Sequence, residues 1–248
     1  MGIYVICGAV IVIALAVMLV CRSRSGEINK MDFVLFDGFT YTGHTGCVGT
    51  KDNSLEAIDK AAEYGVGVVE FDIRFNDKEH ILSHDAPVGG EPTLREALLR
   101  VKQYDGLKAN IDVKEVVGIE NVQPLAEELD MLDRVFFTGI FEADAPVVSE
   151  KCPKIPYYLN MSVAPAKKHT EEYLEGIIGT VKKSGAVGIN FNHGHLSEKL
   201  VEAFHKEGLQ VSVWTVNKED KMYKALGCGV DNITTRHPDM LQKIIEGE

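Results

Sequence analysis

Short apolar segments alternate with longer amphipathic segments along most of the chain, starting near residue 40. The apolar segments are rich in Val, Ile and Phe, and eight of them are predicted as strands, at 40–44, 67–75, 107–113, 134–138, 155–160, 187–191, 210–215 and 231–235. Helical patterns follow each of them, at 54–64, 93–102, 120–131, 143–150, 170–183, 197–206, 218–225 and 238–245. A shorter extended piece at 80–84 follows the second strand.

This alternation predicts an α/β fold with parallel strands and right-handed crossovers. Eight strand–helix units suggest a closed (β/α)8 TIM barrel, which we place at residues 38–248. A doubly wound open sheet is the alternative. The sequence contains no glycine-rich phosphate loop of the GxGxxG or GxxxxGK[ST] kind, which lowers that alternative.

Residues 3–21 differ from the rest of the chain because none of the nineteen carries a charge. As a helix at roughly 1.5 Å per residue they would span about 28 Å, close to the apolar thickness of a bilayer. We therefore predict a transmembrane anchor at residues 1–21 and a linker at 22–37. A cleaved signal peptide is the alternative, but no Lys or Arg precedes the run and no A-x-A site follows it.

The charges beside this segment predict its orientation. Arg22, Arg24 and Lys30 follow it, with only Glu27 opposing them. Positive residues prefer the cytoplasmic side, so we expect a single-pass protein of the cell membrane with the barrel in the cytoplasm.

Composition excludes several classes of protein. The net charge is −11, and residues 31–248 hold 23 basic against 36 acidic residues, which excludes nucleic acid as a partner. The five cysteines are scattered and show neither a disulfide framework nor CxxC metal spacing.

Carboxylates gather at the predicted carboxyl ends of two strands, where barrel enzymes carry their active sites. Glu70 and Asp72 are two residues apart on one strand and share a face, and Asp112 ends the next strand. Such oxygens suit a divalent cation, Mg²⁺ or Ca²⁺. The alternatives are half-exposed acids on a strand and an ion pair between Asp112 and Lys114.

Two histidines and other polar residues lie at the same predicted end. His44 and His84 can act as general base and acid near neutral pH, and Lys114 can bind a phosphate. Alternatively, His84 belongs to a turn and Trp214 to the core. His80 lies in a polar stretch, and we expect it at the surface.

Several short motifs occur in a characteristic order along the chain. They are His44-Thr45-Gly46, Asp52-Asn53-Ser54, Glu70-Phe71-Asp72, His84-Asp85, Asn110 to Lys114, Trp214-Thr215-Val216-Asn217, and Gly229-Val230-Asp231 through Pro238. Together they resemble the glycerophosphodiester phosphodiesterase family, whose patterns are HRG, PENT, ExD, HD, ExK, WTVN and GVDGIxTxxP. The resemblance covers about residues 38–248.

The resemblance implies a (β/α)8 barrel that hydrolyses glycerophosphodiesters, with a divalent metal, to glycerol 3-phosphate and an alcohol. The resemblance also implies roles for individual residues of this chain, on the positions that match the family motifs. They give Glu70, Asp72 and Asp112 as metal ligands, His44 and His84 as the acid/base pair, Lys114 as a phosphate contact and Trp214 as part of the substrate pocket.

The chain departs from the family pattern at four places. Thr45 replaces the arginine after the first histidine, Asp52 is shorter than the usual acid, and Asp112 stands where the family usually has Glu. The segment from His84 to Thr93 also lacks the longer insertion that many members carry. These departures leave two alternatives: a phospholipase D-like enzyme acting on lysolipids, and a non-catalytic binding barrel. The WTVN run favours the phosphodiesterase.

Arg236 is a candidate replacement for the missing arginine. It directly follows the eighth predicted strand, which lies beside the first strand in a closed barrel. Its guanidinium could reach the phosphate near His44 and Thr45. The alternative is a surface arginine that pairs with an acid.

Overall fold

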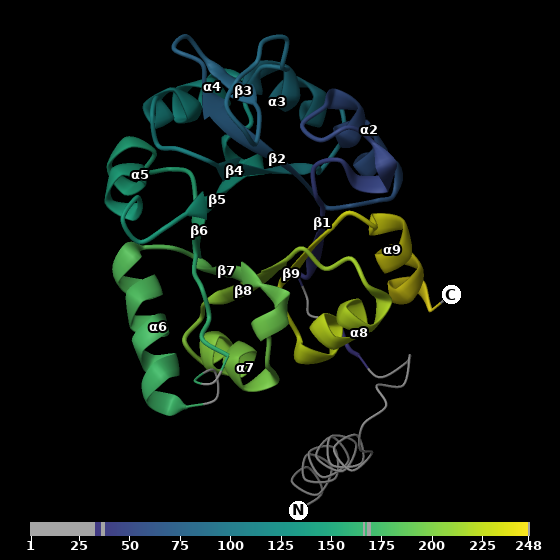
Figure 1. Ribbon diagram of the computed structural model, residues 1–248, viewed down its shortest axis with the longest axis vertical. Coiled ribbons are helices and arrows are strands. Elements are labelled where there is room, and N and C mark those ends of the chain that lie inside the picture. The colour runs from purple at the N-terminus through teal and green to yellow at the C-terminus, as the bar shows by residue number, and fades with distance from the viewer. Residues whose placement is uncertain (1–32, 36–37, 166, 168–169, 248) are drawn as a thin grey trace, which may run out of the picture.

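A closed barrel of parallel strands forms the centre of the molecule in the computed structural model (Figure 1). The structure describes residues 33–35, 38–165, 167 and 170–247. The barrel strands are β1 (Thr40–Gly43), β2 (Val68–Phe75), β4 (Lys108–Val113), β5 (Val135–Ile140), β6 (Tyr157–Asn160), β7 (Gly188–Asn192), β8 (Gln210–Trp214) and β9 (Asn232–Thr235). They follow the order β1-β9-β8-β7-β6-β5-β4-β2, and β1 also pairs with β2. The predicted (β/α)8 barrel is confirmed, and the open-sheet alternative is wrong.

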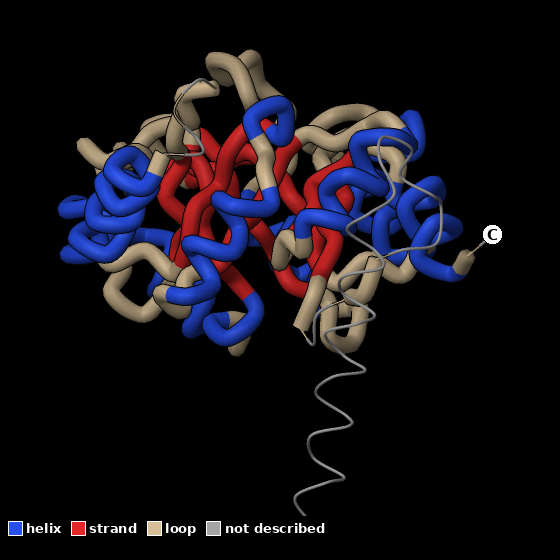
Figure 2. The backbone as a smooth tube through the Cα atoms, turned by 90° about the horizontal axis from the view of Figure 1, so that it is seen from below, coloured by secondary structure: helices blue, strands red, loops and turns tan. Residues whose placement is uncertain are grey.

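Helices surround this barrel as an outer ring (Figures 1 and 2). They are α2 (Leu55–Glu63), α3 (Leu94–Lys102), α4 (Val122–Glu128), α5 (Ala145–Lys151), α6 (Glu171–Ser184), α7 (Glu198–Lys206), α8 (Glu219–Cys228) and α9 (Pro238–Glu246). Local chemistry fixes where several of them begin. At α3, for example, the Thr93 side chain accepts a hydrogen bond from the Glu96 amide while Glu96 caps Thr93 in return.

The alternation of side chains along β2 separates the core from the site. Val69, Phe71 and Ile73 belong to the apolar core, whereas Glu70 and Asp72 line a cavity at the end of the barrel. Because successive strand residues point to opposite faces, one strand supplies both apolar packing and a pair of inward carboxylates.

Two local predictions are wrong. His80 is 5% exposed, because β3 (His80–Leu82) folds back on β2 as an antiparallel hairpin and sets its ring against Phe75, with centroids 5.2 Å apart. The helix predicted over 120–131 is shorter. A 3₁₀ turn at Ile119–Asn121 precedes α4, and the chain leaves the helical conformation at Asp130, which has a φ of 54°.

The predicted anchor at residues 1–21 lies outside the described residues, as does the linker apart from 33–35. Within the part of the chain that is described, no helix is long and apolar enough to cross a membrane.

Candidate active site

A cavity of about 500 Å³ opens where the barrel strands end. The residues that the sequence predicts for the site all line it: His44, Glu70, Asp72, His84, Asp112, Lys114, Trp214 and Arg236. They come from positions up to 192 residues apart in the chain and meet because parallel barrel strands end at one face.

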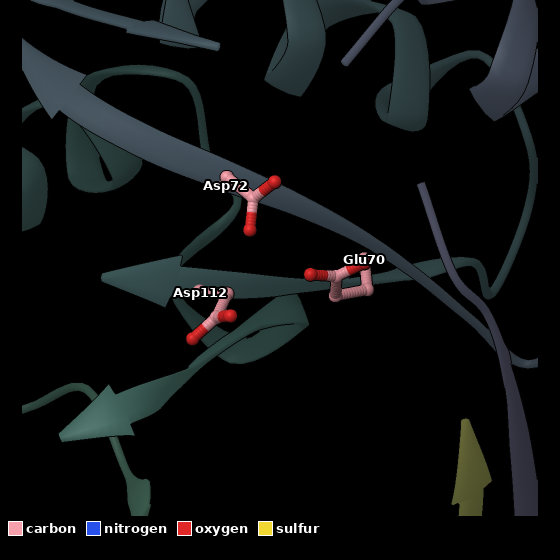
Figure 3. A group of neighbouring side chains, drawn as sticks. All are labelled: Glu70, Asp72 and Asp112. Carbon is pink, nitrogen blue, oxygen red and sulfur yellow. The ribbon is translucent and has the colours of Figure 1, made fainter. Parts of the chain in front are cut away.

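Three carboxylates converge in this cavity (Figure 3). Glu70 and Asp72 extend from β2, and Asp112 extends from β4, where it is in register with Asp72. One oxygen of each lies within 4.8 Å of the others. Gly139 on β5 leaves room for this arrangement, because a Cβ at that position would lie 2.3 Å from Asp112 Oδ1.

Lys114 lies beside two of these acids. Its Nζ is 2.7 Å from Asp72 Oδ1 and 2.7 Å from Asp112 Oδ2, so the ion pair considered from the sequence does form. Burial lowers the pKa of Lys114, but the Asp112 and Asp72 charges outweigh it and raise that pKa overall. Burial, followed by the Asp72 and Asp112 charges, raises the pKa of Glu70 well above its usual value.

The donor set fits a divalent cation. Ligand oxygens about 2.0–2.6 Å from one Mg²⁺ or Ca²⁺ lie at most about 5 Å apart, consistent with the observed separation. Asp112 Oδ1 is buried and accepts no hydrogen bond from the described residues. A cation bound there would offset the repulsion from Asp72 and Asp112, which adds to the effect of burial in raising the pKa of Glu70. Glu70, Asp72 and Asp112 can therefore hold a hard cation with Lys114 beside it.

His44, directly after β1, is oriented as a proton acceptor. Its Nδ1 lies 2.9 Å from the carbonyl oxygen of Thr45, which can only accept, so this network assigns the proton to Nδ1. Nε2 of the neutral ring is then free to take a proton. Burial, assisted by the charge of Arg236, lowers the pKa of His44 below its usual value and favours the neutral ring.

His84 approaches the cavity from the loop after β3. Its side chain is 65% exposed, and Nδ1 lies 3.0 Å from Asp85 Oδ1. Arg74 holds the loop, because its Nε donates to the His84 carbonyl at 2.9 Å and its guanidinium lies 3.3 Å from Glu115. Neither Arg74 nor Glu115 could be identified from the sequence, because the contacts that give them a role join separate segments.

Asn53 is a third residue whose role the sequence did not reveal. Its Nδ2 donates to Asp72 Oδ2 at 2.8 Å, and its Oδ1 accepts the Asp72 amide at 2.9 Å. Thr45, which also bonds to Asn53, donates its amide to Glu70 Oε2 at 2.9 Å. Asn53 and Thr45 therefore orient two of the three carboxylates, and only the resemblance to the PENT motif pointed to this segment.

Arg236 lines the cavity but already has an acidic partner. Its two terminal nitrogens lie 2.6 and 3.1 Å from the two oxygens of Asp52 in a fork. The pair lies over Gly46, where a Cβ would come within 1.8 Å of Asp52 Oδ1. The guanidinium thus lies at the mouth of the cavity and is paired with an acid, and its contact with a phosphate stays a prediction.

Comparisons with known proteins agree with this geometry. Residues 91–240, more than half of the chain, match the model of the glycerophosphoryl diester phosphodiesterase family. The chain belongs to this family. A glycerophosphodiester phosphodiesterase of Caldanaerobacter subterraneus is 23% identical, with 78% of this chain and 92% of the relative covered.

Solved structures of family members share the barrel. The crystal structure of a glycerophosphodiester phosphodiesterase from Parabacteroides distasonis has a TM-score of 0.68 at 19% identity, covering 85% of this chain and 98% of that one. An Oleispira antarctica phosphodiesterase solved with the product sn-glycerol-3-phosphate has a TM-score of 0.66 at 19% identity, covering 84% and 96%. At these identities the likeness establishes the fold, and the resemblance drawn from the motifs is confirmed.

Proposed function

We propose that this chain hydrolyses glycerophosphodiesters to glycerol 3-phosphate and an alcohol, using a divalent cation, Mg²⁺ or Ca²⁺. The observation that carries the proposal is the convergence of Glu70, Asp72 and Asp112 with two histidines in one cavity of a family member. A bound cation supplies charge for the phosphoryl oxygens. The alternative of a non-catalytic barrel is disfavoured, because the replacement of arginine by Thr45 leaves the acid cluster and both histidines in place.

The two histidines accept and donate the protons of the reaction. Water attacks phosphorus, the bond from phosphorus to the alcohol oxygen breaks, and one proton leaves the water while another reaches the alcohol. We assign His44 as the base, because burial lowers its pKa and its Nε2 is free. His84, on the exposed side of the cavity, then gives a proton to the departing alcohol.

Two cationic side chains would bind the phosphate. The ammonium of Lys114 has three donors, of which the contacts to Asp72 and Asp112 use two. The Arg236 guanidinium has five N–H donors, and its fork to Asp52 uses two of them. The remaining donors take the place of the family arginine at the phosphate, and Asp52 fixes the orientation of the guanidinium.

We also infer that residues 3–21 anchor the barrel to the cell membrane, with the barrel in the cytoplasm. This inference rests on nineteen successive uncharged residues followed by Arg22, Arg24 and Lys30. Trp214, which is 37% exposed and lines the cavity, completes the proposed substrate pocket.

The decisive experiment measures release of glycerol 3-phosphate from glycerophosphodiesters with and without a chelator. We expect activity that the chelator abolishes and that Mg²⁺ or Ca²⁺ restores. His44→Ala and His84→Ala should each reduce the rate about a hundredfold or more. His195→Ala is the matched control, since His195 also follows a strand end but does not line the cavity. Cleavage of intact lysolipids with no activity on deacylated diesters would instead establish the phospholipase alternative.

A further inference from the structure

The cavity is divided into a charged half and a neutral half. In the described part of the chain, charged and histidine side chains line it only from β2 and β4 and from the segments that follow β1, β3, β4 and β9. These strands are neighbours in the sheet. The charged and histidine side chains are His44, Asp52, Glu70, Asp72, His84, Asp112, Lys114 and Arg236. Among the residues that the structure describes, the other four neighbouring strands, β5 to β8, and the residues just after them line the cavity only with uncharged side chains. These are Thr138, Gly139, Phe141, Asn160, Asn190, Trp214 and Thr215.

Two amides line the neutral half, and their orientation is fixed. Asn160 Oδ1 accepts the Gly139 amide at 3.1 Å, which identifies that atom as the oxygen. Asn190 therefore presents its amide nitrogen to the same oxygen, at 3.0 Å. Asn190 is 6% exposed, and its Oδ1 has no hydrogen-bond partner among the described residues. A buried amide of this kind gains from a ligand that offers hydroxyl groups.

Two aromatic side chains form the outer lip of the neutral half. Phe141 follows β5 and is 56% exposed, and Trp214 ends β8 and is 37% exposed. Exposed aromatic faces beside amides can pack against the C–H groups of a ligand while the amides bind its hydroxyls.

From this division we infer that the departing alcohol is uncharged and rich in hydroxyl groups, such as a polyol or a cyclitol. The inference rests on the proposed function. The metal ligands and phosphate contacts occupy the charged half, and we place the departing alcohol, rather than the retained glycerol, against the neutral half. No described residue on that half carries a carboxylate that could pair with an ammonium. A quaternary ammonium could contact the aromatic lip, but it offers the amides no hydrogen bond and would displace the water that hydrates them. A primary ammonium could donate to Asn190 Oδ1, but no carboxylate among the described residues of that half would balance its charge.

The size of the cavity agrees with such a ligand. The cavity has a volume of about 500 Å³. This leaves room for organic groups on both sides of the phosphate.

The test compares four substrates that release the same product, glycerol 3-phosphate, using the full-length chain with added metal. Two carry uncharged hydroxylated alcohols, glycerophosphoglycerol and glycerophosphoinositol. Two carry cationic alcohols, glycerophosphocholine and glycerophosphoethanolamine. We expect kcat/KM for the first pair to exceed that for the second about tenfold, the effect of roughly one unmatched polar contact. Equal values for the pairs, or a preference for choline, would overturn the inference while leaving the proposed function intact. Hydrolysis of none of the four would overturn the proposed function itself.

A charge variant provides an independent readout. In Asn160→Asp the side-chain oxygen can still accept from Gly139 and Asn190, but it adds a negative charge to the neutral half. We expect the ratio of kcat/KM for the cationic alcohols to kcat/KM for the uncharged alcohols to rise about tenfold. Asn76→Asp is the matched control, because Asn76 Oδ1 also accepts two hydrogen bonds and lies outside the cavity. A uniform loss on all four substrates in Asn160→Asp would mean that Asn160 only supports the fold, and would reject the inference.

Discussion

Glu70 is a buried carboxylate, and we expect its ionised form to destabilise the fold when no metal is bound. Burial and its acidic neighbours raise its pKa in the folded state, whereas the unfolded chain keeps the ordinary value of about 4.3. Folding stability is therefore lost as the pH rises from that ordinary value through the raised one. We predict that Glu70→Gln raises the melting temperature of the chelator-treated protein at neutral pH by about 2–4 °C, or roughly 1 kcal/mol.

The pH dependence of this difference tests its cause. Near pH 4 Glu70 is largely protonated in both states, so the variant and the wild type should melt at similar temperatures. The difference between their melting temperatures should increase toward neutral pH, as thermal denaturation followed by circular dichroism can show. Glu150→Gln, at an exposed acid, should give no such trend. A lower melting temperature for Glu70→Gln at neutral pH would contradict the argument. The same variant should be inactive, and added metal should not restore its activity.

Arg236 supplies a second prediction at the scale of one residue. Arg236→Ala removes a forked donor from the mouth, and a charge-assisted hydrogen bond is worth about 1.5–3 kcal/mol. We expect kcat/KM for a diester to fall about tenfold to a hundredfold while metal binding stays intact. Added guanidinium ion should restore part of the loss, as steady-state kinetics can measure.

A second forked arginine serves as the control for this experiment. Arg95 pairs with Glu128 at 2.8 and 2.6 Å on the outer surface, away from the cavity. Arg95→Ala therefore removes an equivalent ion pair without touching the site, and its kinetics should match the wild type. Kinetics like the wild type in Arg236→Ala would show that this guanidinium does not bind the phosphate.

At the scale of elements, strand and helix positions follow from local pattern. Each strand of the barrel is a short apolar run that ends near a polar residue, and the helices keep an apolar face toward the sheet. The alternation therefore predicted all eight barrel strands, with ends that differ by a few residues. The burial of His80 could not be predicted in this way, because it comes from pairing with Phe75 across a hairpin. The polar residues around His80 in the sequence do not reveal such a contact.

The difference between local pattern and contacts across separate segments also explains which parts of the site could be predicted. Inward carboxylates on β2 follow from the two-residue period of a strand. By contrast, Asn53 reaches Asp72 across 19 positions and Arg236 reaches Asp52 across 184. Such partners depend on how the barrel closes, and a single sequence gives only motif resemblance as a guide to them.

The hairpin of β2 and β3 provides a prediction at this scale. Arg74 ties the strand to the loop that carries His84, by donating to the His84 carbonyl. We expect Arg74→Ala to lower kcat through a misplaced His84, with Arg74→Lys recovering part of it. In a double-mutant cycle, adding Arg74→Ala to His84→Ala should cause little further loss. Additive losses, measured as kcat on one diester, would show that Arg74 acts independently of His84.

At the scale of the whole molecule, the chain combines an acidic barrel with an uncharged N-terminal segment. Residues 31–248 hold 36 acidic and 23 basic residues, so the barrel would not adhere to anionic lipid by charge. Attachment to a membrane would therefore depend on residues 3–21. The predicted linker of residues 22–37 would allow a reach of at most about 55 Å when fully extended.

The charges after residue 21 determine the expected topology. Arg22, Arg24 and Lys30 should keep the barrel in the cytoplasm, so protease added to intact cells should leave it undigested. Permeabilised cells should show rapid digestion, as immunoblotting of a C-terminal epitope can record. Replacing the three basic residues by Gln removes the bias and should expose a fraction of the barrel to protease outside. Complete digestion of the wild type on intact cells would reverse the orientation and leave the enzymatic proposal standing, because the site residues all lie in the barrel.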